Sequence, residues 1–220
     1  MLVVLRFLER YLGFMRLNKQ YVFFFVLAGF FIISVMCFSG RTLYAPVFSK
    51  FRGKNTVIEV LNRIEAPVLK RLGPVLSRHE LSVPLDEIAL IGLKEERSLE
   101  LWAKKGGAWV FLKAYPFTSF SGKLGPKLRE GDLQIPEGIY GLDYLNPNSS
   151  YYLSMKISYP NDFDKRMGLK DGRENLGGDI FIHGKNVTIG CIPVGDEAIE
   201  ELFYLAGKMP REKIKVIIAP

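Results

Sequence analysis

A run of 17 uncharged, apolar residues near the N-terminus constrains this chain more than any other feature. It covers residues 22–38 and has the sequence VFFFVLAGFFIISVMCF. A helix of this length spans about 26 Å, slightly less than the roughly 30 Å hydrocarbon core of a bilayer. Because a helix in a soluble core usually keeps one polar face, a segment that is apolar on every face predicts a membrane helix.

The residues that flank this run predict its orientation. Only Glu9 opposes the four basic residues that precede the run, which are Arg6, Arg10, Arg16 and Lys19. Basic residues favour retention in the cytoplasm, so we expect the rest of the chain to be exported. The sequence Cys37-Phe38-Ser39 fits a cleavage site poorly, and the lead before the run is long for a signal peptide. Residues 1–39 therefore predict an uncleaved signal anchor, with a cleaved signal peptide as the alternative.

Charge and cysteine content exclude two classes of protein. The 30 basic and 23 acidic residues give a net charge of +7. Residues 1–39 contain four of the basic residues and one of the acidic residues, so 26 and 22 remain, spread without a basic run. This pattern predicts no nucleic-acid partner. With two cysteines, Cys37 and Cys191, and two histidines, we expect neither a disulfide framework nor a zinc site.

Residues 40–85 predict a linker followed by a short helical arm. Thr56 and Glu59 have the spacing of a capping box at a helix start. An apolar stripe follows at helical spacing, formed by Val57, Val60, Leu61 and Ile64. Pro67 is expected to start a second helix, and Pro74 to break or bend it. The arm either packs on the main domain or separates it from the membrane.

Residues 86–220 have a mostly β pattern and form the predicted main domain. Gly106 and Gly107 separate two alternating or aromatic-rich runs, as in a hairpin. Strands are predicted at residues 88–95, 99–104, 108–117, 151–158, 178–183 and 213–219, and a helix at residues 196–206. The fold class expected from this order is mainly β with α, an α+β domain.

The chemistry concentrates in residues 180–193, IFIHGKNVTIGCIP. Cys191 is the sole cysteine in the part predicted to be exported, so its thiol is either buried and inert or a nucleophile. His183 ends a predicted strand eight residues earlier, and an imidazole can take a thiol proton and return it to a leaving group. Gly190 allows close backbone approach, and the N–H groups of Gly190 and Cys191 would suit an oxyanion. Spacing alone leaves both alternatives open.

These residues resemble a known family. Ile182-His183-Gly184, followed by Thr188, Gly190, Cys191 and Ile192, is similar to the active-site motif of the L,D-transpeptidases, the YkuD-type catalytic domain. Upstream motifs resemble the YafK-like branch of that family: Ser121-Gly122, Gly125-Pro126-Lys127, Glu130-Gly131-Asp132, Pro136-Glu137-Gly138-Ile139-Tyr140, Tyr159-Pro160-Asn161 and Asp164. The resemblance covers roughly residues 86–205.

The resemblance implies a β-sandwich-like catalytic domain with Cys191 as nucleophile and His183 as base, and no metal or other cofactor. The implied substrates are peptidoglycan stem peptides, cut after meso-diaminopimelate to give an acyl-enzyme. An amine of a second stem peptide, or of a murein-linked lipoprotein, would then resolve the acyl-enzyme. The implied location is the bacterial cell envelope, with the domain in the periplasm, inner-membrane anchored or secreted.

The sequence also departs from the family pattern. Ile189 stands where most members have a second histidine, and Pro193 stands where many have Arg or Asn. The YafK-like branch shares the missing histidine and includes hydrolases that cut the lipoprotein–murein linkage. An L,D-transpeptidase is therefore expected, with a murein hydrolase and a catalytically silent murein-binding protein as alternatives.

Five further residues are predicted to contact substrate or the reacting groups: Thr188, Gly184, Tyr159, Asn161 and Lys123. Each has a structural alternative. Thr188 is a common turn residue, Lys123 suits a solvated loop, and Pro160 makes an ordinary turn plausible beside Tyr159 and Asn161. The sequence does not identify the group that orients His183, for which a backbone carbonyl near Gly184 is one candidate.

Overall fold

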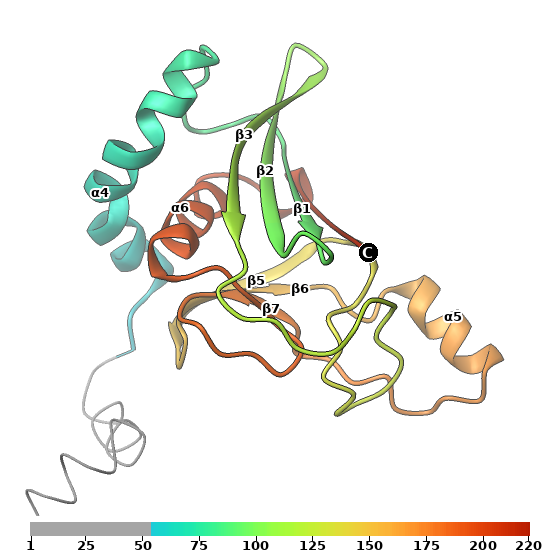
Figure 1. Ribbon diagram of the computed structural model, residues 1–220. Helices are drawn as coiled ribbons and strands as arrows, with labels where there is room; N and C mark the ends of the chain where they lie inside the picture. The colour runs from blue at the N-terminus through green and yellow to red at the C-terminus, as the bar shows by residue number, and fades with distance from the viewer. Residues whose placement is uncertain (1–53) are drawn as a thin grey trace, which may run out of the picture. The chain divides into compact units, whose positions relative to one another are not determined.

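The structure is a computed structural model, and it describes residues 54–220. Within these residues two sheets and three α-helices form one α+β unit (Figure 1). One sheet has the order β3-β2-β1-β9-β4, with bounds β1 (Ile88–Leu93), β2 (Ser98–Lys105), β3 (Ala108–Pro116), β4 (Gly138–Tyr140) and β9 (Ile214–Ala219). The other has the order β5-β6-β7-β8, with bounds β5 (Leu142–Ser149), β6 (Tyr152–Ile157), β7 (Phe181–His183) and β8 (Ile192–Pro193).

Both sheets are mixed. In the first, β1 pairs antiparallel with β2 and parallel with β9, and in the second, β7 pairs antiparallel with β6 and parallel with β8. Along β2, Leu99, Leu101 and Ala103 are fully buried while their neighbours are partly exposed. Because buried and partly exposed residues alternate with the period of two seen in the sequence, one face of the sheet packs into the core. The predicted α+β class is confirmed.

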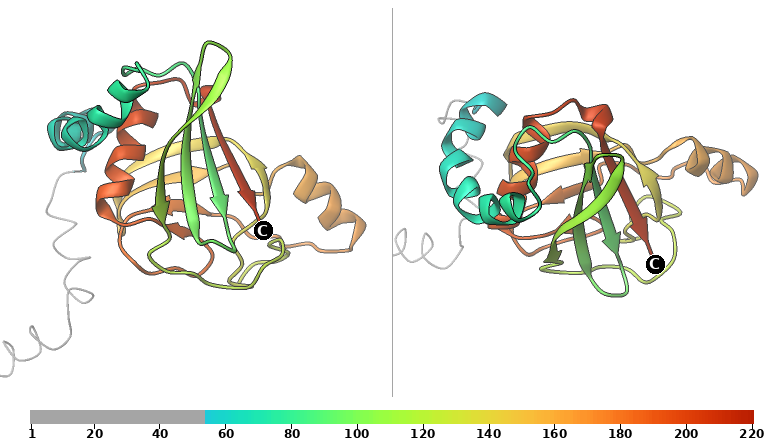
Figure 2. Two further views of the ribbon diagram at one scale, coloured as in Figure 1. Left: turned by 45° about the horizontal axis from the view of Figure 1, so that its top comes forward. Right: turned by 90° about the horizontal axis from the view of Figure 1, so that it is seen from above.

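The helical arm is one helix, α4 (Val57–Arg78), and not the two that Pro67 suggested. Its start is as predicted, because Thr56 and Glu59 form the expected capping box. Both prolines lie inside the helix, where each removes one hydrogen bond. The helix continues because one stripe stays buried along it, formed by Val60, Leu61, Ile64, Val68, Leu72 and Leu76, and it bends along its length (Figure 2).

The arm packs on the main domain. Helix α6 (Asp196–Gly207) lies between α4 and the strands of the second sheet. Glu201 of α6 is 1% exposed, and its carboxylate accepts hydrogen bonds from Arg71 of α4 and from Lys113 and Tyr115 of β3. The predicted membrane helix over residues 22–38 lies outside the described residues. In the described range 54–220, no helix is both long and apolar enough to cross a bilayer.

Helix α5 (Asp162–Lys170) was not predicted, and it projects from the sheets (Figures 1 and 2). Asn161 caps it, because its side chain accepts the backbone N–H of Asp164 while the Asp164 carboxylate accepts the N–H of Asn161. Strand β5 was also missed. It is an edge strand, so Pro147 can lie within it without removing an internal sheet hydrogen bond.

Candidate active site

His183 and Cys191 lie on neighbouring parallel strands of the second sheet. The register pairs Ile182 with Ile192 and His183 with Pro193. Cys191 directly precedes β8, so the same register places it beside Phe181. Side chains two residues apart along a strand share a face. Extending this register by one residue beyond β8 puts the imidazole and the thiol on the same face of the sheet, two residue positions apart along the strands.

The imidazole of His183 has a defined proton arrangement. Its Nδ1 lies 2.6 Å from the carbonyl oxygen of Gly184. A carbonyl oxygen only accepts, so Nδ1 carries the hydrogen and Nε2 of the neutral ring keeps its lone pair. The side chain is 1% exposed, and its ring lies 4.6 Å from that of Tyr151. Burial lowers the pKa of His183, and the Gly184 bond offsets part of that effect, so the site favours the neutral ring with Nε2 unprotonated.

The thiol of Cys191 is half-buried. Its Sγ donates to the carbonyl oxygen of Asp179 at 3.6 Å, and no hydrogen bond joins Sγ to an imidazole in residues 54–220. Burial raises the pKa of this thiol. A backbone hydrogen bond to Phe181 and the charge of Lys127 partly offset that rise, while the Asp179 carboxylate adds to it. Both pKa shifts therefore favour the neutral form, of the thiol and of the imidazole alike.

The loop before the cysteine is held by Thr188. Its Oγ1 donates to the carbonyl oxygen of Cys191 at 2.7 Å and accepts the N–H of Gly190 at 3.2 Å. Gly190 has a φ of +125°, and a Cβ there would lie 3.1 Å from the carbonyl oxygen of Gln134. Glycine is therefore needed at this position. The N–H of Gly190, one of the two predicted oxyanion donors, is engaged by Thr188 in this arrangement.

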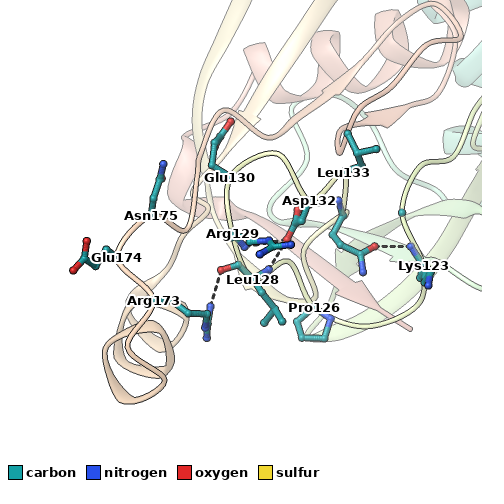
Figure 3. Close-up of a pocket in the computed structure, with 12 residues that line it drawn as sticks. Lys123, Pro126, Leu128, Arg129, Glu130, Asp132, Leu133, Arg173, Glu174 and Asn175 are labelled. Carbon is teal, nitrogen blue, oxygen red and sulfur yellow. Dashed lines mark hydrogen bonds between the residues drawn. The ribbon is translucent and has the colours of Figure 1, made fainter.

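A groove of about 880 Å³ lies close to this loop, and Figure 3 shows the residues that line it. Two segments line it, residues 122–134 and residues 173–175. Its charged groups are mixed, with three cations (Lys123, Arg129 and Arg173) and three carboxylates (Glu130, Asp132 and Glu174). Neither Cys191 nor His183 is among its lining residues. The close approach of Gly190 to Gln134, which lines the groove, makes its wall and the cysteine loop continuous.

The other predicted contact residues lie in different environments. Lys123 is exposed in the groove, and its backbone N–H donates to Gln134 Oε1 at 2.5 Å. Tyr159 is 4% exposed, and its hydroxyl donates to the carbonyl oxygen of Leu176 at 3.0 Å. Asn161 caps α5 and donates to the carbonyl oxygen of Ile139. The structure thus gives Tyr159 and Asn161 structural contacts, and leaves Lys123 able to meet a ligand.

Gly184 is buried beside the imidazole. A Cβ at this position would lie 2.6 Å from Asp196 Oδ1 and 2.8 Å from the carbonyl oxygen of Tyr151, so no side chain fits. Sequence reasoning missed both Tyr151 and Asp196. Neither belongs to a recognisable motif, and Tyr151 lies 32 residues before His183, so only the sheet register and the packing of α6 bring them together. No group of three metal-ligating side chains occurs in the described range 54–220.

The family comparison agrees with this arrangement. The L,D-transpeptidase catalytic domain family (YkuD) matches residues 86–218, which is more than half of the chain. The chain belongs to the YkuD family. The resemblance predicted from the His183-Gly184 and Gly190-Cys191 motifs is thus confirmed.

Several relatives of this YkuD-family chain are known. A protein of Escherichia coli strain K12, provisionally named L,D-transpeptidase YafK, is 39% identical over 112 residues, which is 50% of this chain and 43% of the relative. The chain thus matches less than half the length of that relative. Among solved structures, the helical cell shape determining protein Pgp2 from Campylobacter jejuni has a TM-score of 0.49 at 23% identity, covering 66% of this chain and 54% of Pgp2. Bd1075 of Bdellovibrio bacteriovorus has a TM-score of 0.45 at 24% identity, covering 63% of this chain and 49% of Bd1075.

Proposed function

We propose that this protein is a cysteine-dependent L,D-transpeptidase that acts on peptidoglycan stem peptides in the cell envelope. Family membership supports the reaction class. The observation that carries the assignment of roles is the bond between His183 Nδ1 and the Gly184 carbonyl oxygen, because it leaves Nε2 as a free base on the face that Cys191 shares. Cys191 is the proposed nucleophile and His183 the proposed base.

The proposed reaction has two transfers. Nε2 of His183 takes the thiol proton as Sγ attacks the carbonyl carbon of meso-diaminopimelate, in the amide that joins this residue to D-Ala. The C–N bond then breaks, the imidazolium returns the proton to the departing amine of D-Ala, and a thioester remains on Cys191. An acceptor amine attacks the thioester, forms the new amide and releases the thiol. Since the Gly190 N–H is engaged by Thr188, we assign oxyanion binding to the Cys191 N–H and expect Gly190 to contribute only after Thr188 rotates.

The groove beside the cysteine loop is the proposed substrate cleft. Lys123 and Arg129 are exposed there, and cationic groups suit the carboxylates of a stem peptide. Gly190 joins the groove to Cys191 through its contact with Gln134. A stem peptide in the groove would therefore run past the thiol.

A murein hydrolase is the second candidate, and two observations favour it. Pro193 is buried and paired with His183, so no polar side chain extends from the position where many relatives have Arg or Asn. Ile189 is 76% exposed where most relatives have a second histidine. A site with fewer groups to hold an acceptor amine would favour water as the acceptor, and the product would then be a cut crosslink or a released murein-linked lipoprotein.

We further propose the domain arrangement that the sequence predicted. Residues 1–39 form the membrane anchor or signal peptide, residues 40–85 the linker and arm, and residues 86–220 the catalytic domain. This arrangement places the catalytic domain outside the cytoplasmic membrane, where its proposed substrate lies.

The test is the product of the reaction. The full chain, purified in a mild detergent, is incubated with isolated sacculi, which are then digested and analysed by mass spectrometry. A transpeptidase yields new crosslinks between two meso-diaminopimelate residues and free D-Ala, while a hydrolase yields cut crosslinks or released protein without new crosslinks. Both products must disappear in Cys191→Ala and persist in the matched control Cys37→Ala. Bound sacculi with no product from the unaltered chain would instead support a silent murein-binding protein.

A further inference from the structure

The peptide group between Gly184 and Lys185 makes two hydrogen bonds in opposite directions. Its oxygen accepts from Nδ1 of His183 at 2.6 Å, and its N–H donates to Oδ1 of Asp196 at 2.8 Å. A trans peptide is planar, and its C=O and N–H point in opposite directions. Holding the N–H toward Asp196 therefore holds the carbonyl oxygen toward the imidazole.

Lys185, whose N–H belongs to this peptide group, is also hydrogen-bonded at its carbonyl oxygen and its ammonium group. Lys185 has a φ of +60°, a conformation that a residue with a side chain rarely adopts. Its carbonyl oxygen accepts from Thr118 Oγ1 at 2.6 Å, and its Nζ donates to the carbonyl oxygen of Ser150 at 2.5 Å. Together with the Asp196 bond, these contacts fix the turn in one orientation, as expected where a strained conformation is maintained by its surroundings.

We propose that Asp196 is a positioning residue for His183, acting through the Gly184–Lys185 peptide, with Thr118 as a second support of the same turn. The proposal rests on the proposed function, in which His183 is the base. The carboxylate holds the peptide in place and polarises it, so that the Gly184 carbonyl becomes a stronger acceptor for Nδ1–H. This favours the tautomer with Nε2 unprotonated and stabilises the imidazolium that forms when the thiol proton is taken.

The location of the two residues separates this role from a role in folding. Asp196 and Thr118 are both exposed, and neither belongs to the buried core. Asp196 is the first residue of α6, but the cap of that helix is Gly195, which provides no side-chain bond. Replacing Asp196 or Thr118 should therefore change the turn more than the stability of the domain.

The first experiment reads the tautomer directly. The chain has two histidines, His79 and His183, so ¹⁵N-histidine NMR of the full chain in detergent gives two assignable rings, with His79→Gln identifying the second. The unaltered chain should show Nδ1 protonated and Nε2 unprotonated at pH 7. Asp196→Ala should raise the Nε2–H population of His183 several-fold, and Asp196→Asn, which keeps an acceptor oxygen, should stay close to the unaltered chain.

The second experiment reads catalysis. Asp196→Ala should lower kcat for a stem-peptide substrate about tenfold, the loss expected for one charge-assisted hydrogen bond, and leave KM unchanged. Asp196→Asn should lose less. Thr118→Val should reproduce the direction of both effects, while Thr118→Ser, which keeps the hydroxyl, should not.

An unchanged His183 tautomer in Asp196→Ala and in Thr118→Val would overturn the proposal, even if the enzyme is active. Equal loss of kcat in Asp196→Ala and Asp196→Asn with an unchanged tautomer would overturn it as well. If the unaltered chain processes no stem peptide, the proposed function fails, and the NMR result still decides the positioning role. Thermal midpoints for the four variants show whether each is folded, and the Thr118 pair provides the test if the Asp196 variants are not.

Discussion

The turn that follows β7 and the loop that precedes β8 carry the two proposed reacting groups, and hydrogen bonds hold them very differently. In the turn, Gly184 and Lys185 are fixed by bonds to Asp196, Thr118 and Leu153. In the loop, Thr188 makes two hydrogen bonds within the loop itself, Val187 and Ile189 are 52% and 76% exposed, and the Cys191 thiol donates only a long bond, to the Asp179 carbonyl. The difference indicates that the surrounding domain fixes the proposed base, while the loop of the proposed nucleophile is held mainly by its own hydrogen bonds.

The largest effect is expected from the turn that follows β7, where His183 lies. Replacing His183 with Gln removes the base and should lower kcat/KM for a stem-peptide substrate about 10²–10⁴-fold. His79→Gln, the matched control at the end of α4, should leave the rate unchanged. A His183→Gln variant within twofold of the unaltered rate would show that another group takes the thiol proton.

A smaller effect is expected from the loop that precedes β8, which Thr188 organises. Thr188→Val removes both hydrogen bonds that organise the loop, the one to the Cys191 carbonyl and the one from the Gly190 N–H. At a net value of about 1 kcal/mol for each hydrogen bond, loss of the two predicts a loss of roughly five- to thirtyfold in kcat. Thr188→Ser keeps the hydroxyl and should retain most of the rate. A rate that rises in Thr188→Val would instead mean that freeing the Gly190 N–H for the oxyanion matters more.

The pH dependence tests why the base is neutral. Tyr151 covers the His183 ring, and burial lowers the pKa of that imidazole. The proposed mechanism uses the unprotonated ring as the base, so activity is expected to fall as the pH drops through this pKa. Tyr151→Ala should expose the ring and raise its pKa toward the ordinary value of 6.5, so the acid limb of kcat/KM moves to higher pH. Tyr151→Phe should keep the limb in place, and an unmoved limb in Tyr151→Ala would exclude shielding by this ring.

The smallest effects separate structural contacts from substrate contacts. Asn161→Ala removes the cap of α5 and should lower the free energy of unfolding by about 1 kcal/mol, with KM unchanged. Lys123→Ala, in the groove, should raise KM and leave the stability unchanged. Urea unfolding and steady-state kinetics on the two variants measure both quantities. A raised KM in Asn161→Ala would restore this residue as a substrate contact.

Local patterns explain which parts of the fold could be predicted. The Thr56 cap, the strands β1 to β3 and the helix α6 follow from neighbouring residues, and each appears near its predicted place. The continuity of α4 through Pro67 depends on packing against α6, which no local pattern contains. Helix α5 was missed although the sequence holds a signal for it. Asn161 and Asp164 have the spacing of a capping box, which marks a helix start.

The candidate site also contains residues that a local motif predicts and residues that only tertiary packing brings in. His183, Gly184, Gly190 and Cys191 were found because they lie within one short motif. Asp196 and Tyr151 were missed because their contacts with the turn arise from the packing of α6 and from the start of β6 beside β7. Tyr159 was placed in the cleft because it lies within a family motif, but a motif does not show that its hydroxyl bonds to Leu176 inside the domain.

The most direct test of the account is the intact mass of the enzyme after a brief incubation with a tetrapeptide muropeptide ending in D-Ala, followed by acid quenching. Using Cys37→Ala leaves Cys191 as the single thiol of the chain. If Cys191 is the nucleophile, the mass increases by the muropeptide acyl group, on the peptide that contains Cys191, and does not increase in the Cys37→Ala/Cys191→Ala variant. Release of D-Ala by that double variant, or an acyl group on any other residue, would contradict it.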